Sequence, residues 1–417
     1  MDKYGRKLTV MVIANLICVL GSAVQYTAVA DMESYVLFIC GRFLIGFASG
    51  LTTFISLYMA ECSSEKDKAF AAAVCIGVPS FFMNSGGVIN LPFLMGTEQL
   101  WRYSLLLSIP INVIHLSCIG WVRESPKHLY LTKRNEPLAR QSFQFYRGTG
   151  ADWAEQKEVY DLEQACSRNA VSVSWRQLFA SKNLLWPFVI CVVMTTTNCA
   201  GGINLLYTYS TETMQQLGLS RESSSVLLVL ALGLPTVVAT NLFALGDGFE
   251  RFGRRPSLLV GYGANVLGSA MMFVGDAMGS SSQTSTLKII IGVLGQMVVT
   301  IGFAVGPFAV GTLLPAELAP QVSRALTGAA SYAGHWGLTI AISLAFPPLR
   351  ASIGAYALLP LVAVSCAAFL FVLKWFPETK GKTVNELARL WPSPPAGPSA
   401  AAAAREGSPL LSSPTPT

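Results

Sequence analysis

An all-α membrane protein made of two related helical halves is the fold that this sequence predicts. Three observations support that prediction: the chain is rich in apolar residues and poor in charged ones, its apolar residues gather in long runs, and a set of short polar motifs occurs twice in the same order. Helices are the expected element because a single segment that crosses a bilayer has to satisfy its own backbone hydrogen bonds.

The composition is typical of a protein embedded in lipid. Hydrophobic residues make up 52% of the chain and charged residues only 12%, whereas soluble domains carry about 25% charged residues. A helix that crosses a bilayer needs about 20 apolar residues, and several stretches meet that length. We predict ten spans, at residues 8–29, 35–60, 69–94, 102–122, 184–209, 223–246, 256–277, 287–314, 325–346 and 353–376.

Two short basic motifs, each centred on a glycine, mark corresponding points of the two halves. Gly5 lies in Asp-Lys-Tyr-Gly-Arg-Lys, and Gly253 lies in Glu-Arg-Phe-Gly-Arg-Arg. Two glutamates follow each glycine, and equivalent residues are about 250 positions apart, which indicates an internal duplication. The glutamates are Glu61 and Glu124 in the first half and Glu317 and Glu378 in the second.

The duplication also predicts the domain organisation. Two apolar spans within residues 184–246 precede the second motif, but none precedes the first. We therefore expect the N-terminal half to lack two helices that the C-terminal half has. The expected domains are a four-helix N-terminal half (1–122), a cytosolic helical linker (123–183), a six-helix C-terminal half (184–391) and a disordered cytosolic tail (392–417).

Positive charges are concentrated in one set of loops. They gather around residues 3–7, 66–68, 123–183, 251–255 and 374–382, whereas the intervening loops are short and poor in cations. Loops rich in Lys and Arg stay in the cytosol, so we predict that these loops and both termini are cytosolic. Because this asymmetry accounts for the net charge of +6, the expected partner is the lipid bilayer and not a nucleic acid.

The linker and the tail differ in pattern. Residues 135–143 and 152–166 read as short amphipathic helices, the first with proline near its start; a merely solvated linker is the alternative. The tail is rich in Pro, Ser and Ala, which predicts disorder. Within it, Glu406, Leu410 and Leu411 resemble an acidic dileucine signal, which implies a clathrin adaptor as partner and endosomal or lysosomal sorting. A chance match, and a plasma-membrane location, is the alternative.

The repeated Gly, Arg and Glu residues predict a gate at the cytosolic face. Glycine permits a tight turn, and arginine can reach helix-terminal carbonyls and nearby carboxylates. We expect ion pairs that hold this face closed and break when the halves rock. Charges that only set topology are the alternative, but they do not explain the repeated Gly and Glu. The predicted gate residues are Gly5, Arg6, Glu61, Glu124, Arg251, Gly253, Arg254, Arg255, Glu317, Arg324 and Glu378.

Five motifs together resemble those of a known family. They are Gly-Arg-Phe-Leu-Ile-Gly at 41–46, Glu-Ser-Pro-Lys at 124–127, Gly-Arg-Arg at 253–255, Pro-Ala-Glu at 315–317 and Pro-Glu-Thr-Lys-Gly at 377–381. In this order they are similar to the signature set of the sugar porters, the glucose-transporter branch of the major facilitator superfamily. Because that family has twelve helices, the resemblance implies that this chain begins in the loop after the second helix.

The resemblance implies a substrate site formed mainly by the seventh and eleventh family helices. Asn204 matches an asparagine that hydrogen-bonds the sugar, and the adjacent Gly201 and Gly202 would allow the helix to break, as at transporter sites near the bilayer midplane. Arg42 matches an arginine of the translocation domain. The implied substrate-binding residues are Asn198, Asn204, Thr312, His335, Trp336, Thr339 and Arg42.

Several positions depart from the family pattern. Ile76 replaces a glutamine, Thr312 replaces a tryptophan that closes over the sugar, and His335 and Thr339 replace asparagines. A site built for hydroxyl groups loses discrimination when its hydrogen-bonding partners vanish, so the pocket predicts a specificity other than ordinary glucose transport. For His335 the alternative is a helix-packing role, and for Arg42 it is a side chain that extends to the membrane surface.

The function expected from these observations is facilitative transport of a hexose or similar small polyol by alternating access. A transport-incompetent relative that acts as a sensor or partner, or an incomplete gene product, is the alternative from a different class. A proton-coupled symporter is a third reading, which the lack of a mid-span Asp or Glu disfavours. The sequence shows no nucleotide loop, nucleophile triad or metal cluster, so we expect neither an enzyme nor a cofactor.

Overall fold

Most of the part that the computed structural model describes is helical, and no strand occurs within that part. The described residues are 5–52, 55–64, 67–169, 173–200, 203–245, 252–278, 282–320, 322–380 and 382. Inside the helices, the side chains of Ile76, Thr312 and Glu317 lie outside the description. The predicted all-α fold is confirmed.

The N-terminal half begins with a π-helical segment, η1 (Leu8–Ile13), that runs directly into α1 (Ala14–Ala30). The spans that follow are α2 (Tyr35–Thr52), α3 (Ile55–Cys62) and α4 (Lys68–Ile89). The predicted span 102–122 is instead broken into α5 (Trp101–Ser104), α6 (Ser108–Ser117) and a 3₁₀ turn. Pro110 explains the break, because a proline has no N–H to donate to the carbonyl one turn earlier.

Four short helices connect the halves: α7 (Pro126–Leu131), α8 (Glu136–Arg147), α9 (Trp153–Asn169) and α10 (Trp175–Ala180). The Asn135 side chain caps α8 by accepting from the Leu138 amide at 3.1 Å. Phe143, Trp153 and Tyr160 pack into a small aromatic core between α8 and α9. Both amphipathic helices predicted in this segment are therefore present.

The described residues of the C-terminal half form nine α-helices. α16 packs along α17 and α20, and α11 packs along α19, which places the largest buried cluster, around Met194 and Tyr262, between α11, α16, α18 and α20. The helices are α11 (Lys182–Ala200), α12 (Ile203–Gln216), α13 (Arg221–Leu228), α14 (Leu234–Leu245), α16 (Arg254–Ala277), α17 (Ser282–Val305), α18 (Pro307–Leu318), α19 (Arg324–Ile353) and α20 (Leu359–Trp375), with a π-helical segment η3 (Val229–Gly233) before α14 and a 3₁₀ segment η4 (Gly354–Leu358) before α20.

Seven helical runs in the described residues are long and apolar enough to cross a membrane. The last of them, Arg324–Trp375, has 52 residues because it holds α19, η4 and α20 together, and Tyr35–Leu51 is a shorter apolar helix. Residues 347–352, which fall between two predicted spans, are helical: α19 continues through Pro347 and Pro348 and ends at Ile353. The next residue, Gly354, has a φ of +58°, a backbone conformation that favours glycine. The count of ten spans stays a prediction.

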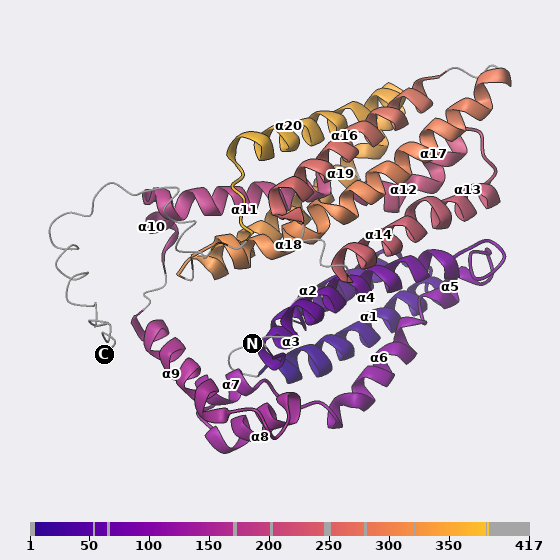
Figure 1. Cartoon of the computed structure of the whole chain (residues 1–417). Helices are drawn as coiled ribbons and strands as arrows, with labels where there is room; N and C mark the ends of the chain where they lie inside the picture. The colour runs from indigo at the N-terminus through magenta and orange to yellow at the C-terminus, as the bar shows by residue number, and fades with distance from the viewer. Residues whose placement is uncertain are drawn as a thin grey trace.

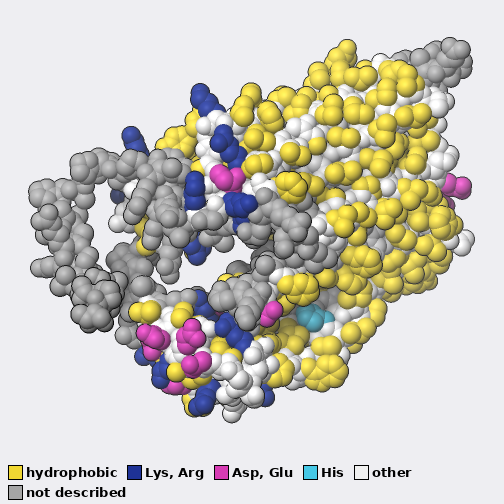
Figure 2. Space-filling view, viewed as in Figure 1, with side chains coloured by type: hydrophobic (Ala, Val, Ile, Leu, Met, Phe, Trp, Pro, Cys, Tyr) yellow, Lys and Arg dark blue, Asp and Glu magenta, His cyan; other side chains and the backbone are white. Residues whose placement is uncertain are grey.

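The two halves lie side by side, and α4 of the first half runs along η3 and α14 of the second (Figure 1). Helices α1 and α16 both begin at the end of the molecule where α7 to α10 lie (Figure 1). Lys and Arg side chains gather at that end, and hydrophobic side chains cover the bundle beyond it (Figure 2). We call the end that carries Arg6, Arg254 and Arg255 the basic end.

Candidate functional site

The first glycine motif forms a turn that clasps a distant glutamate. Gly5 has a φ of +95°, and the helix begins immediately after it. The amides of Arg6 and Lys7 donate to the Glu124 carboxylate at 3.0 to 3.2 Å. The Thr9 hydroxyl donates back to the Gly5 carbonyl at 2.7 Å. We call this arrangement the first clasp.

The second glycine motif forms the same arrangement in the C-terminal half. Gly253 has a φ of +87° and precedes α16. The amides of Arg254 and Arg255 donate to Glu378 at 3.0 and 3.1 Å. The Ser257 hydroxyl donates to the Gly253 carbonyl at 2.7 Å. We call this the second clasp.

The two clasps use the same chemistry. The first amides of a helix have no partner inside the helix, and they carry the positive end of its dipole, so a carboxylate is a favourable acceptor there. In each half, the glutamate comes from the chain segment that follows the last span of that half. The sequence duplication therefore corresponds to a repeated three-dimensional contact.

Side-chain charges extend the first clasp into a network. Arg6 donates from Nη2 to Glu61 Oε1 at 3.3 Å and from Nη1 to His128 Nδ1 at 3.0 Å. The other Glu61 oxygen accepts from the Ser125 hydroxyl. Helix α3 is thereby tied to α7 through a group of side chains that is largely buried, with His128 only 1% exposed.

Of the remaining predicted gate residues, some donate to backbone carbonyls and others lie outside the described residues. Arg255 donates from Nη2 to the Leu373 carbonyl at 2.6 Å, and exposed Arg324 donates from Nε to the Ala319 carbonyl at 3.4 Å. Arg251 and the Glu317 side chain lie outside the described residues. The first clasp joins the N-terminal half to the start of the linker, and the second lies within the C-terminal half. The predicted latch between halves therefore stays a prediction.

Acidification is expected to loosen the first clasp through His128. Burial, and next the Arg6 guanidinium, lower the pKa of His128 below its ordinary 6.5. The folded protein thus holds this ring neutral, whereas the unfolded chain takes up a proton as the pH falls through 6.5, so folding stability falls in that direction. The melting temperature of the purified chain should decline from pH 7.5 to 5.5. His128→Gln, which cannot titrate, should flatten that decline; an unchanged slope would contradict the assignment.

A second group of polar side chains lies within the membrane-spanning part of the C-terminal half. Asn204 Nδ2, on α12, donates to Thr339 Oγ1 on α19 at 3.1 Å. The Thr339 hydroxyl donates to the His335 carbonyl at 2.9 Å, and His335 Nδ1 donates to the Thr195 carbonyl of α11 at 3.0 Å. Three of the predicted substrate residues are therefore brought together by α11, α12 and α19.

The other four predicted substrate residues differ in their exposure and in their contacts. Asn198 is 4% exposed, and its Oδ1 has no hydrogen-bond partner among the described residues. Trp336 is 57% exposed and meets the His335 ring edge to face at 5.2 Å. Arg42 is exposed and lies over the Phe38 ring at 5.3 Å, and within the described residues no hydrogen bond or ion pair joins it to the other six. The Thr312 side chain lies outside the description.

The structure adds a polar link between the halves that sequence reasoning missed. The Asn84 amide, on α4, hydrogen-bonds the Tyr207 hydroxyl on α12, which also pairs with the Thr236 hydroxyl at 3.2 Å. Asn84 also donates to the Ser80 carbonyl at 2.7 Å. An asparagine within an apolar span is costly unless it has a hydrogen-bond partner. The presence of Asn84 in such a span is the sequence feature that could have predicted this link.

The fold is that of a polytopic helical membrane protein. The sequence matches the family described as "Sugar (and other) transporter" over residues 1–391. The chain therefore belongs to the sugar (and other) transporter family. Facilitated glucose transporter member 3 of solute carrier family 2 from Mus musculus is 26% identical, over 93% of this chain and 77% of that protein. Member 5 from Equus caballus is 24% identical, over 93% and 75%, and member 9 from Homo sapiens is 24% identical, over 92% and 70%.

Solved structures agree on the fold. The inward-open xylose transporter XylE from E. coli matches with a TM-score of 0.74 at 18% identity, over 94% of this chain and 84% of that one. A double-tryptophan XylE mutant matches with a TM-score of 0.73 at 21% identity, over the same shares. Another XylE structure carries the description of a major facilitator superfamily protein. The predicted major facilitator superfamily fold is confirmed.

Proposed function

We propose that this protein is a uniporter that lets a hexose or a similarly sized polyol cross the membrane by alternating access. The observation that carries the proposal is the hydrogen-bonded group of Asn204, Thr339 and His335, which lies in the span region of a sugar-transporter family member. Neutral amide and hydroxyl groups of this kind suit a neutral substrate rich in hydroxyls, because both partners can donate and accept.

Unpaired hydrogen-bonding capacity supports a substrate position next to this group. The buried Asn198 Oδ1 has no hydrogen-bond partner among the described residues, and Asn204 Oδ1 accepts no hydrogen bond from them. Buried polar atoms normally find a partner, and a sugar hydroxyl would supply one. We propose Asn198, Asn204, His335 and Thr339 as substrate contacts, with Thr312, Trp336 and Arg42 as further candidates.

The clasps are proposed to keep each half rigid while the halves move. Each clasp fastens a helix start to the segment after the last span of the same half. The interface that then has to move is the one between α4 and η3–α14. The gate role of Arg251, Glu317 and Arg324 belongs to the same proposal and awaits a functional test.

The basic end is proposed to face the cytosol, and the plasma membrane is the proposed location. The gathering of Lys and Arg at one end supports that orientation (Figure 2). The proposed adaptor signal of Glu406, Leu410 and Leu411 lies outside the described residues, so endosomal or lysosomal sorting is a separate proposal that tail variants would test.

Uptake into proteoliposomes tests the proposed transport. The full chain should accumulate radiolabelled glucose, fructose or a linear polyol faster than empty liposomes do, and at a saturable rate. Counterflow driven only by unlabelled sugar inside, with no pH gradient, is expected for a uniporter. Strict dependence on a pH gradient would instead favour a symporter. No uptake of any sugar by correctly folded protein would favour the transport-incompetent alternative.

A further inference from the structure

A hollow with a volume of about 390 Å³ lies at the end of the bundle opposite the basic end. It sits between the last turns of α12, α16 and α19 and the segment η4, all of which belong to the C-terminal half. We call it the distal hollow. Its lining includes Tyr209, Glu212, Gln216, Asp276, Phe346 and Arg350.

The positive charge in the distal hollow is already neutralised. Arg350 Nη1 pairs with Asp276 Oδ2 at 2.7 Å, and both side chains are nearly buried, at 11% and 9% exposed. The Arg350 guanidinium also donates from Nε to Gln216 Oε1 at 3.0 Å. A buried guanidinium with these partners acts as a structural link between α16, α12 and α19 and not as a receptor for an anion.

One negative charge in the distal hollow has no such partner. Glu212 lies on α12 four residues before its end and is exposed. It has no ion pair or hydrogen bond within the described part of the chain. With the Arg350–Asp276 pair balanced, the lining carries a net negative charge at Glu212.

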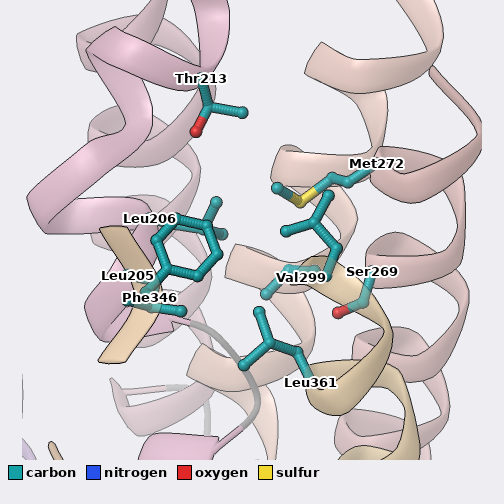
Figure 3. A pocket seen from close by; sticks show the side chains of 9 residues that line it. Leu205, Leu206, Thr213, Ser269, Met272, Val299, Phe346 and Leu361 are labelled. Carbon is teal, nitrogen blue, oxygen red and sulfur yellow. The ribbon is translucent and has the colours of Figure 1, made fainter. Parts of the chain in front are cut away.

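The remaining wall of the distal hollow is aromatic and apolar. The rings of Tyr209 and Phe346 pack at 5.6 Å, and the Tyr209 hydroxyl donates to the Ser343 carbonyl at 3.0 Å, which fixes its ring. Phe346 and Thr213 also line a small cavity of about 10 Å³ beneath, whose other walls are mostly aliphatic, as Figure 3 shows. The floor under the hollow therefore offers little to a polar ligand.

From these features we propose that the distal hollow binds a small organic ammonium ion with an apolar body. The ammonium group pairs with the Glu212 carboxylate, and the apolar body rests on Phe346 and Tyr209, where the ring faces also attract a cation. A metal ion fits less well, because Ca²⁺ requires six or more oxygen ligands and a single carboxylate here is unpaired.

This site is separate from the proposed sugar contacts. Glu212 follows Asn204 by eight residues on α12, which places the two about 12 Å apart along the helix. None of the four residues proposed as principal sugar contacts lines the distal hollow. The proposal therefore stands without the proposed transport activity.

Binding of benzylammonium to the full chain in lipid nanodiscs tests the proposal. Titration calorimetry at pH 7 should detect saturable binding, and benzyl alcohol, a neutral molecule of similar shape, should bind at least about 10-fold more weakly. Equal binding of the alcohol would overturn the charge assignment. Displacement of benzylammonium by glucose would overturn the proposal in favour of a sugar vestibule.

Three variants locate the site. Glu212→Gln should raise the Kd for benzylammonium about 10-fold, whereas Glu222→Gln, which alters an exposed carboxylate of α13 outside the hollow, should leave the Kd unchanged. Ala351→Phe, which fills the hollow without altering charge, should abolish binding. A similar loss for Glu222→Gln, or undiminished binding to Glu212→Gln or Ala351→Phe, would contradict the proposed site.

Discussion

Replacing Gly5 by alanine is expected to destabilise the protein far more than the same change at Gly148. Both glycines have a positive φ, +95° and +85°, so alanine is strained at either position by about 1–3 kcal/mol. At Gly148 a Cβ atom meets nothing within 4 Å, whereas at Gly5 it would lie 2.3 Å from Glu124 Oε2. Gly148→Ala thus measures backbone strain alone.

The additional cost at Gly5 is the cost of opening the first clasp. The Glu124 side chain could swing away from a new methyl group, but it is held by the amides of Arg6, Lys7 and Ser125. Hydrogen bonds to a charged group contribute about 1.5–3 kcal/mol. Gly5→Ala should therefore cost at least about 2 kcal/mol more than Gly148→Ala in the free energy of unfolding.

Thermal or denaturant unfolding of the two variants in one detergent provides the measurement. Gly253→Ala is a further test, because its Cβ would lie 2.9 Å from Glu378 Oε2 and should give an intermediate loss. Adding Glu124→Ala to Gly5→Ala removes the clash, so the second substitution should cost less than it does alone. Equal losses for Gly5→Ala and Gly148→Ala would show that the carboxylate does not hold the turn.

The clasps show what the sequence could predict. The duplication predicted the same role for Gly5 and Gly253, and the same role for Glu124 and Glu378, because motifs repeated in order imply repeated contacts. It did not show that the backbone amides are the donors. That detail depends on the left-handed turn that points two amides toward one carboxylate, and a motif of cations instead suggested side-chain ion pairs.

Contacts between helices were less predictable. The pairing of Asn84 with Tyr207 depends on how α4 and α12 are rotated about their axes, and apolar spans with little periodicity do not fix that rotation. The distal hollow was missed for a related reason. Residues 347–352 were predicted as a short loop between two spans, but as the last part of α19 they place Arg350 against Asp276.

The largest expected effect on transport comes from Asn204→Ala. The side chain donates to Thr339, and its Oδ1 is the proposed acceptor for a substrate hydroxyl. Losing two neutral hydrogen bonds costs about 1–3 kcal/mol. The kcat/KM for sugar uptake should then fall about 10- to 100-fold. Thr208→Val serves as the control. Among the described residues, that exposed hydroxyl donates only to the Asn204 carbonyl within α12, so its loss should change uptake little.

Thr339→Val tests whether the Thr339 hydroxyl acts on the substrate independently or only positions the Asn204 side chain. If the hydroxyl only orients Asn204, removing it from the wild type should reduce kcat/KM about 3- to 10-fold, whereas removing it from Asn204→Ala should change little, because the pair no longer exists. Strictly additive losses in this double-mutant cycle would mean that the two side chains act independently. Unchanged uptake by Asn204→Ala would move the substrate site elsewhere in the bundle.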